Sequence, residues 1–340
     1  MESSHLRIRN RCSDPGPGGF VLRGFFYARL CIRSETITHG FSTFVRGQCY
    51  HSAVDRNRNA TAITILNLKG GVGKTHTAWL TAAACEETGF KLLLVDLDPQ
   101  ANLTSSFRST DVGERSVEAL FDPAADCDIT TLVRNTEFRR IDLIPASAAL
   151  ARFDVANQRD WEAADLHLSL TDAVEELRPH YDLILFDCPP RLSLVSFAAL
   201  CASDGVVIPM EAADWGAQGI VQVTEAVRYV QERFNSRLQL LGYVVSRFKR
   251  ARAYQQSYLK QLRAHFGEMA FDTVIPDLAR FEKSVTDRIP ITLHAPGSPE
   301  AHIARRFFAE LYRRAQRVHG SGRGSRRENV QRTAFAGAER

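Results

Sequence analysis

A glycine-rich segment with two lysines is the part of the chain best suited to chemistry. Residues 67–75 read Asn-Leu-Lys-Gly-Gly-Val-Gly-Lys-Thr. They follow an apolar, β-branched run at 62–66 and precede an Ala-rich stretch at 75–87 without Gly or Pro, which predicts a strand, a loop and a helix. Loop N–H groups and the helix dipole attract a phosphate, and Lys74 neutralises it. The segment predicts a phosphate-binding loop, because a glycine turn without function would not need this context.

Lys69 distinguishes this loop from the ordinary one. The ordinary motif starts with Gly, where this chain has Leu68, and it needs no charge at the next position. Binding one phosphate therefore requires Lys74 but does not require Lys69. The second lysine indicates a variant loop with an additional function.

Two further apolar runs end in carboxylates. One run ends in Asp96, Asp98 and a proline turn, and the other ends in Asp187. Asp187 fits the Walker B pattern, in which a buried strand delivers a carboxylate to Mg²⁺ opposite the Thr75 hydroxyl. Asp98 is placed to orient the water that attacks the γ-phosphate, directly or through the magnesium shell. Asp96 is expected to support the loop, and a structural role is the alternative for each of these carboxylates.

The elements that must position these groups alternate from residue 60 onward between short apolar runs and helical patterns. This alternation predicts an α/β fold with a mainly parallel, doubly wound sheet and helices on both faces. Ligands bind such sheets at the carboxyl ends of the strands, where the residues above are placed. The predicted strands are Ile63–Leu66, Leu92–Leu97, Ile141–Ile144, Leu183–Phe186, Gly205–Pro209, Leu241–Val245 and Phe271–Ile275.

Charge and periodicity divide the 340 residues into three predicted parts. Residues 1–59 form an extension of unknown order, without a helix-turn-helix pattern and with nine Arg against four acidic residues. Residues 60–312 form the catalytic domain, and residues 313–340 form a flexible basic tail with eight Arg against two acidic residues. The net charge of +4 therefore comes from the two ends, and the middle is acidic. A nucleic-acid surface must be a local patch or a tail.

The composition indicates a reduced, cytosolic protein. The seven cysteines are scattered and form no CxxC pair, and no apolar run approaches the length that crosses a bilayer. An Arg-rich start can resemble a transit peptide, but the Pro-Gly residues at 15–19 break a helix there. The amphipathic pattern at 301–318 predicts a closing helix on the sheet, and a helix lying on a membrane surface is the alternative.

Four motifs resemble those of the ParA-type partition ATPases, which are P-loop NTPases with a deviant Walker A motif. The same class includes the MinD cell-division regulators, other cargo-positioning ATPases, arsenite-pump ATPases and nitrogenase iron proteins. The motifs are therefore specific for the class but less specific for one branch within it. The resemblance spans about residues 60–312 and is carried by Lys69–Thr75, Asp96–Gln100, Ile144–Ala146 and Asp187–Pro190.

This resemblance implies ATP and Mg²⁺ as cofactors. Lys74 then binds the phosphates of its own nucleotide, and Lys69 reaches across a dimer to the ATP of the partner. Thr75, Asp98 and Asp187 are the implied metal residues, and Asp98 is also the switch carboxylate for hydrolysis. The implied ATP-binding residues are Lys69, Gly70, Gly71, Val72, Gly73, Lys74, Thr75, His76, Ser246 and Arg247.

Two positions depart from the family pattern. His76 replaces the usual Thr, and a less favourable contact with the α-phosphate is expected. Ala101 replaces the Gly of Gln-Gly-Asn, which is a mild change. Ser246 and Arg247 lie where the family contacts adenine.

The resemblance also implies partners. ATP drives homodimerisation and nonspecific DNA binding, and a ParB-like centromere-binding protein stimulates slow hydrolysis. Such a protein is cytoplasmic, associates with the nucleoid when ATP-bound and does not insert stably into membranes. Arg250, Arg252 and Arg280 are the candidate DNA contacts, with a solvated charged loop as the alternative.

Two competing functions follow from the same class. A MinD-like membrane-surface regulator would use the helix at 301–318, but a Gly-Ser-Arg tail follows that helix and does not look like a terminal anchor. An electron donor needs thiolates that bridge subunits, and Cys127 and Cys188 lack a supporting pattern. An ion-pump ATPase also fits poorly. DNA binding is favoured by the basic loop, which carries Arg247, Lys249, Arg250 and Arg252.

Overall fold

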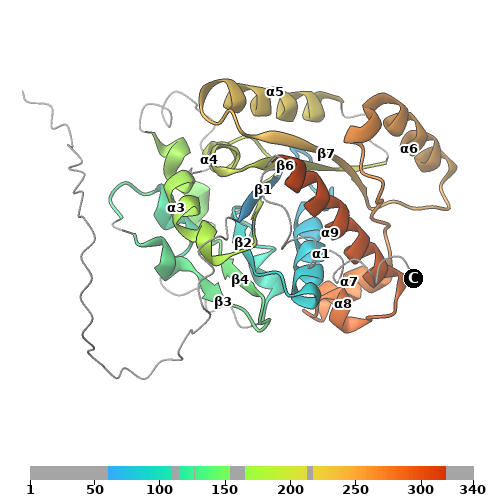
Figure 1. Ribbon diagram of the computed structural model, residues 1–340, viewed down its shortest axis with the longest axis horizontal. Coiled ribbons are helices and arrows are strands. Elements are labelled where there is room, and N and C mark those ends of the chain that lie inside the picture. The colour runs from blue at the N-terminus through green and yellow to red at the C-terminus, as the bar shows by residue number, and fades with distance from the viewer. Residues whose placement is uncertain (1–59, 109–114, 126, 154–164, 213–216, 319–340) are drawn as a thin grey trace, which may run out of the picture. The chain divides into compact units, whose positions relative to one another are not determined.

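The computed structural model describes residues 60–108, 115–125, 127–153, 165–212 and 217–318 (Figure 1). The predicted extension at 1–59 lies outside the described residues, as does the tail from residue 319. The last helix continues to Val318, past position 312.

One seven-stranded sheet forms the centre of the described part, and every neighbouring pair is parallel except the β3–β4 pair. The predicted α/β fold with a mainly parallel sheet is therefore confirmed. The strand order is β3-β4-β2-β5-β1-β6-β7, with β1 Thr61–Ile65, β2 Leu92–Asp96, β3 Arg134–Asn135, β4 Ile141–Ile144, β5 Leu183–Asp187, β6 Gly205–Glu211 and β7 Gln239–Ser246.

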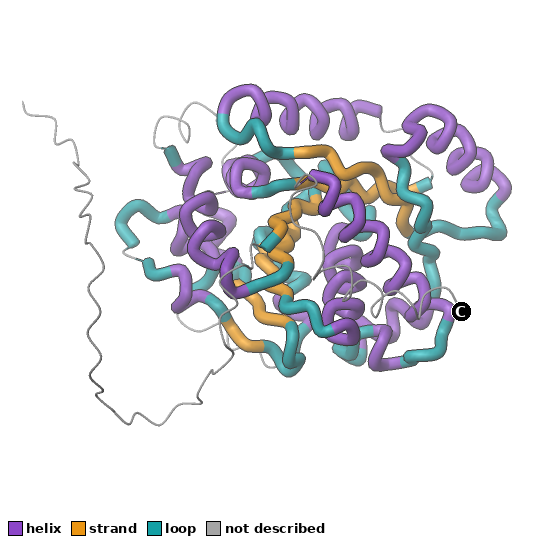
Figure 2. The backbone as a smooth tube through the Cα atoms, viewed as in Figure 1, coloured by secondary structure: helices purple, strands orange, loops and turns teal. Residues whose placement is uncertain are grey.

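Helices cover both faces of this sheet (Figures 1 and 2). In β5, Leu183 and Leu185 belong to the core under α1 and α9, whereas Ile184 and Phe186 belong to the core under α3, α4 and α5. This alternation follows from the two-residue period of a strand. The helices are α1 Lys74–Thr88, α3 Ser169–Leu177, α4 Leu194–Ala202, α5 Ala217–Arg233, α6 Ala253–Phe266, α7 Ala279–Thr286, α8 Ile291–His294 and α9 Pro299–Val318.

The predicted closing helix corresponds to α9. Phe307, Phe308, Leu311 and Tyr312 are buried in the core that α9 shares with α1. The apolar face of α9 is therefore occupied by the protein itself, which argues against the interpretation of this helix as a membrane-surface element. In the described ranges, no helix is long and apolar enough to span a bilayer.

The prediction of a strand at Phe271–Ile275 is wrong. This segment is not part of a ladder, and isolated bridges flank it at Ala270 and Pro276. The N–H groups of Asp272 and Thr273 donate instead to the two carboxylate oxygens of Glu310, each at 2.8 Å, and Arg314 pairs with this carboxylate at 2.9 Å. Phe271 and Ile275 still donate to the carbonyls of Tyr243 and Val245 in β7, at 2.8 and 2.9 Å, so the Glu310 side chain interrupts the pairing only between them. The strand of the sheet that was not predicted is β3, because its two residues are too few to show an alternating pattern.

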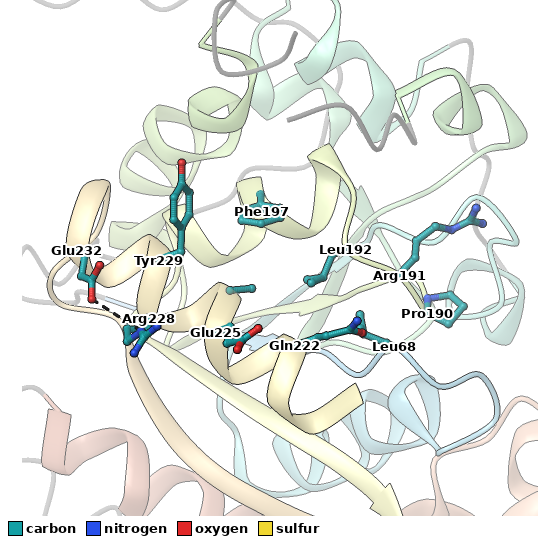
Figure 3. Close-up of a pocket in the computed structure, with 11 residues that line it drawn as sticks. Leu68, Pro190, Arg191, Leu192, Phe197, Gln222, Glu225, Arg228, Tyr229 and Glu232 are labelled. Carbon is teal, nitrogen blue, oxygen red and sulfur yellow. Dashed lines mark ion pairs between the residues drawn. The ribbon is translucent and has the colours of Figure 1, made fainter. Parts of the chain in front are cut away.

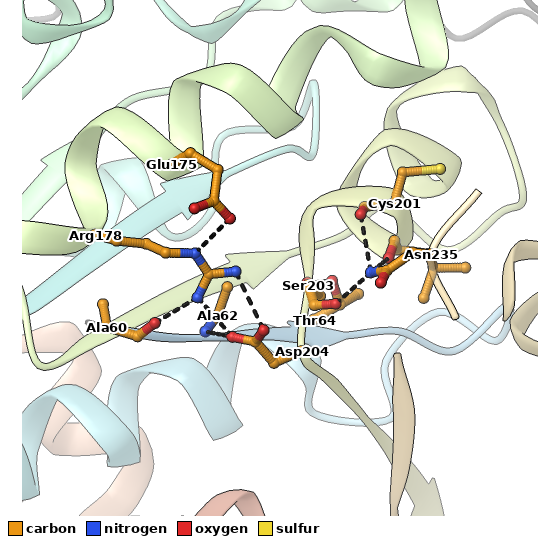
Figure 4. A network of polar contacts seen from close by, with 10 residues as sticks. Ala60, Ala62, Thr64, Glu175, Arg178, Cys201, Ser203, Asp204 and Asn235 are labelled. Atoms are coloured by element: carbon orange, nitrogen blue, oxygen red, sulfur yellow. Dashed lines mark hydrogen bonds and ion pairs between the residues drawn. The ribbon is translucent and has the colours of Figure 1, made fainter. Parts of the chain in front are cut away.

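A buried ion pair fastens the start of the sheet (Figure 4). Arg178 donates to both carboxylate oxygens of Asp204, at 2.7 and 3.2 Å, and to the carbonyl of Ala60. Its Nε bonds Glu175 at 2.9 Å, and Asp204 also accepts the N–H of Ala62 at 2.8 Å. The pair therefore ties β1, α3 and β6 together where the described domain begins.

We predict that Arg178→Ala lowers the free energy of unfolding by about 3–5 kcal/mol, because it leaves the buried Asp204 carboxylate without its cation. Urea unfolding followed by circular dichroism measures this change. The matched control is Arg228→Ala, which removes an exposed pair with Glu232 at 3.8 Å and should cost less than about 0.5 kcal/mol. Equal losses in the two variants would contradict the structural role of Arg178.

Candidate functional site

The phosphate-binding loop connects the end of β1 to the start of α1, as the sequence predicts. Gly71 and Gly73 have φ values of 76° and 85°, in the left-handed region that glycine enters without strain. Gly73 is the N-cap of α1, and no side chain caps this helix end. The N–H groups of the first helical turn therefore remain available to an anion.

Lys74 lies inside the loop. Its ammonium donates to the carbonyls of Asn67 and Lys69, both at 3.1 Å, and the residue is buried. Burial lowers the pKa of Lys74, while the nearby charges of Asp187 and Asp98 oppose this shift. Loop carbonyls rather than a carboxylate thus hold the ammonium in a position to receive a phosphate group.

Lys69 has the opposite environment. Its side chain is 45% exposed, and its ammonium pairs with Glu211 at the end of β6, at 3.5 Å. The N–H of Lys69 donates to the Asn67 side chain at 2.9 Å, and Asn67 in turn donates to the carbonyl of Pro209 at 2.6 Å. The end of β6 therefore fixes the first half of the loop.

The carboxylates of Asp96 and Asp187 lie on adjacent strands in parallel register. Asp96 accepts hydrogen bonds from the N–H and hydroxyl of Thr104, at 2.9 and 2.8 Å, and from the N–H of Asp98 at 3.1 Å. Burial raises the pKa of Asp96 to about 6 against these bonds. Asp96 therefore holds the loop that follows β2, which is the role expected from the sequence.

Asp187 lacks such support. Both of its carboxylate oxygens are buried without a hydrogen bond of ordinary geometry, although the Thr75 hydroxyl lies near enough to favour the ionised form. Burial raises the pKa of Asp187 well above its usual range, and the charge of Asp96 adds to this shift. A buried carboxylate without a partner is costly, and a divalent cation would offset that cost.

Thr75 and Asp187 consequently fit a magnesium ion, which binds through one or two protein oxygens together with phosphate oxygens. Asp98, the third predicted metal residue, is nearly buried, and one of its oxygens accepts the N–H of Gln100 at 2.9 Å. Its charge acts on both Asp187 and Lys74. Asp98 therefore belongs to the same group of interacting charges as Asp187 and Lys74. One of its carboxylate oxygens stabilises the conformation of its own loop.

Ala101 lies in this same loop with φ 51°. Only glycine adopts this left-handed conformation freely, and for other residues it costs about 1 kcal/mol or more. The departure from the Gln-Gly-Asn pattern thus falls at a position where a glycine would relieve backbone strain.

The predicted base-contacting residues fasten the loop from the β7 side. Ser246 donates to the carbonyl of Val72, and Arg247 donates to the carbonyl of Gly71 at 3.1 Å. Arg247 also lies 3.9 Å from Glu211. The ends of β6 and β7 therefore both hold the phosphate-binding loop.

His76 faces the ring of Phe281, with centroids 5.0 Å apart in an edge-on arrangement. Burial, with the charge of Arg247, lowers the pKa of His76 to about 4, while Asp277 opposes the shift. His76 is therefore neutral at pH 7, and its aromatic contact lies beside the loop that Arg247 anchors.

The three candidate DNA contacts do not share one environment. Arg250 and Arg252 are exposed on the loop between β7 and α6. Arg280 lies at the start of α7, where it pairs with Glu300 at 2.8 Å. The two segments run close together, because the N–H of Asp277 donates to the carbonyl of Phe248 at 3.0 Å.

Sequence reasoning missed Glu211 and Asn67. Glu211 is the last residue of β6, a strand that was predicted to end at Pro209, and its position at the carboxyl end of a parallel strand was the available signal. The hydrogen bond of Asn67 to β6 had no signal in the sequence.

A groove of about 690 Å³ opens beside the loop, between α4 and α5 (Figure 3). Leu68 and Pro190 lie at one end of it, and Tyr229 and Glu232 lie at the other. Leu68 of the phosphate-binding loop lines it, whereas Lys74, Thr75 and Asp187 do not. Its walls come from segments far apart in the chain, which is why no local pattern indicated it.

Solved structures with this fold bind nucleotides. Cobyrinic acid a,c-diamide synthase from Mycobacterium smegmatis, with bound ADP and magnesium, has a TM-score of 0.58 at 27% identity and covers 65% of this chain and 88% of its own. An ATP complex of McdA from Cyanothece has a TM-score of 0.64 at 20% identity and covers 79% of this chain and 100% of its own, which shows the shared fold.

Sequence relatives are more specific. Residues 60–240 match the family described as AAA domain. The chain is 36% identical to the chromosome-partitioning ATPase Soj of Thermus thermophilus over 254 residues, which are 75% of this chain and 96% of that protein. It is 31% identical to the chromosome partitioning protein ParA of Myxococcus xanthus over 76% of this chain and 88% of that protein. The chain therefore belongs to the Soj/ParA family of partitioning ATPases.

Proposed function

We propose that the protein is a magnesium-dependent ATPase that dimerises on binding ATP and then binds DNA without sequence preference. The contrast between the two loop lysines carries this proposal. Lys74 is buried where a phosphate of its own nucleotide would bind, whereas Lys69 is exposed at the edge of the loop. An exposed cation at this edge is available to the phosphates of a nucleotide in a second copy.

Hydrolysis in such a site depends on positioning and charge stabilisation. Lys74 and the uncapped N–H groups of α1 would hold the phosphates. Thr75 and Asp187 would hold a magnesium ion, which would supply positive charge to the phosphates. Asp98 would orient the attacking water, and its loop is held in place by Asp96. A slow basal rate suits a switch that a partner must trigger.

Lys69 must change partners to act in a dimer. Within one chain, Glu211 lies between Lys69 and Arg247, at 3.5 and 3.9 Å. Such a partly exposed pair contributes at most about 1 kcal/mol. The multiply charged phosphates of the second copy can therefore displace Glu211, and the exchange couples ATP binding to dimer formation.

DNA partitioning follows from the family and from the basic loop. The dimer would bind chromosomal or plasmid DNA through Arg250, Arg252 and Arg280. A ParB-like centromere-binding protein would stimulate hydrolysis and release the DNA. The protein would then be cytoplasmic and would associate with the nucleoid in its ATP form.

We predict that Asp187→Asn lowers ATP hydrolysis by about 100-fold or more and removes the effect of Mg²⁺ on ATP affinity. Binding of a fluorescent ATP analogue with Mg²⁺ and with EDTA measures the second effect. The variant should be at least as stable as the original chain, because both carboxylate oxygens of Asp187 are buried without a hydrogen bond of ordinary geometry. Retained magnesium dependence would contradict the assignment.

Lys69→Ala should retain ATP affinity within about threefold but lose ATP-dependent dimerisation and DNA binding. Glu211→Gln should act in the opposite direction and lower the ATP concentration needed for dimerisation by up to about fivefold, since the ion pair between Glu211 and Lys69 is gone. Analytical ultracentrifugation across an ATP titration measures both. A normal ATP-induced dimer of Lys69→Ala would return the loop to an ordinary phosphate-binding role.

Arg280→Ala should flatten the slope of log affinity against log salt for duplex DNA by about one, because one phosphate contact is lost. The variant lacking Arg250, Arg252 and Arg280 should not bind at physiological salt. Fluorescence anisotropy measures binding, and Arg237→Ala, at an exposed position in the turn before β7, is the control. Unchanged binding in the triple variant would refute the interface.

A further inference from the structure

An exposed tyrosine lies among the basic residues of the β7–α6 loop. Tyr254, in the first turn of α6, is 52% exposed. Among the described residues, it is the only aromatic side chain in the group of large, exposed hydrophobic residues, which otherwise consists of Leu168, Val221 and Leu293. An aromatic ring of this size is normally buried for most of its surface, so the exposure of Tyr254 is unusual.

The ring is held in place by its neighbours. The Arg252 guanidinium donates to the Tyr254 hydroxyl at 2.8 Å and lies 6.0 Å from the ring centroid. The side-chain amide of Gln255 reaches the same hydroxyl at 3.5 Å. The cation and the ring thus form one unit at the surface.

The loop that carries this unit is fastened to α6. The buried side chain of Gln255 accepts the N–H of Lys249, and the side chain of Gln256 donates to the carbonyl of Arg250 at 2.7 Å. The N–H of Arg252 donates to the carbonyl of Lys249 at 3.0 Å. These bonds reduce the entropy that a ligand would have to remove on binding.

The charge around the ring is positive. Lys249 pairs with Asp277 at 3.0 Å. In the part of the chain that the structure describes, no carboxylate forms an ion pair with Arg250 or Arg252. The guanidinium of Arg252, which contacts the ring, and that of Arg250, two residues earlier on the same exposed loop, can therefore bind a polyanion.

We infer that Tyr254 and Arg252 form a stacking platform for an unpaired nucleic-acid base, with Arg250 on the adjoining phosphate. The inference rests on the proposed DNA-binding role of this loop. Bases in a duplex cover each other, so the ring adds nothing to duplex binding, whereas an unpaired base stacks on an aromatic ring. The loop therefore binds single-stranded DNA through stacking as well as charge.

Fluorescence anisotropy of the full chain with ATP and Mg²⁺ tests this with three probes: a thymidine oligonucleotide, an abasic oligomer of equal length and a duplex. Tyr254→Leu should weaken thymidine binding about tenfold and leave abasic and duplex binding unchanged. Tyr254→Phe, which loses the hydrogen bond from Arg252 but keeps the ring, should retain most thymidine binding. Arg252→Ala should weaken binding to all three probes.

Other outcomes separate this inference from the proposed function. Suppose that the original chain binds the duplex and that Tyr254→Leu binds the thymidine oligonucleotide as tightly as the original chain does. The stacking role of Tyr254 is then wrong, whereas the proposed DNA-binding function is retained. An equal loss on all three probes in Tyr254→Leu also overturns stacking. If the original chain binds no probe, both proposals fail. Binding to phosphatidylglycerol vesicles that requires Tyr254, without thymidine binding, would assign the ring to a membrane instead.

Discussion

The buried carboxylate of Asp187 is the constraint on which the site depends. Parallel register between β2 and β5 brings it beside Asp96, in a region where water cannot screen either charge. The protein satisfies Asp96 through Thr104 and the following loop. Asp187 receives no equivalent set of bonds, and its charged form is favoured by Lys74 and Thr75 alone among the described residues. This asymmetry creates the demand for a cation where the loop would place the phosphates.

The phosphate-binding loop is held from behind by the ends of two neighbouring strands. Asn67 is bonded to β6, and the carbonyls of Gly71 and Val72 are bonded to residues at the end of β7. The basic loop begins directly after this second attachment. A shift of the phosphate-binding loop would therefore reach Arg250 and Arg252 through a few residues of backbone. The proposed nucleotide and DNA surfaces are neighbours in one chain, and dimerisation is not the only physical route that connects them.

Most strands could be predicted because a buried parallel strand is a contiguous apolar run, and six of the seven predicted runs are strands. The failure at Phe271–Ile275 has a specific cause. Its apolar residues Phe271 and Ile275 are indeed buried, but the Glu310 carboxylate, from another element, accepts hydrogen bonds from the N–H groups between them. An apolar pattern reports burial, whereas strand formation depends on which acceptor reaches the backbone. The ion pair between Arg280 and Glu300 could not be predicted either, because it joins α7 to α9 and no local pattern indicates such a contact.

The sequence by itself determined the chemistry of the loop, since strand, glycines, Lys74 and Thr75 are contiguous and their local conformation follows from residue type. It also determined that Asp98 follows one apolar strand and that Asp187 ends another. Only the tertiary structure decided which buried carboxylate lacks a partner and which acid meets Lys69. These outcomes depend on strand order and register, which bring together side chains from distant segments. Local patterns do not encode such contacts, because the energy of a buried charge is set by its surroundings.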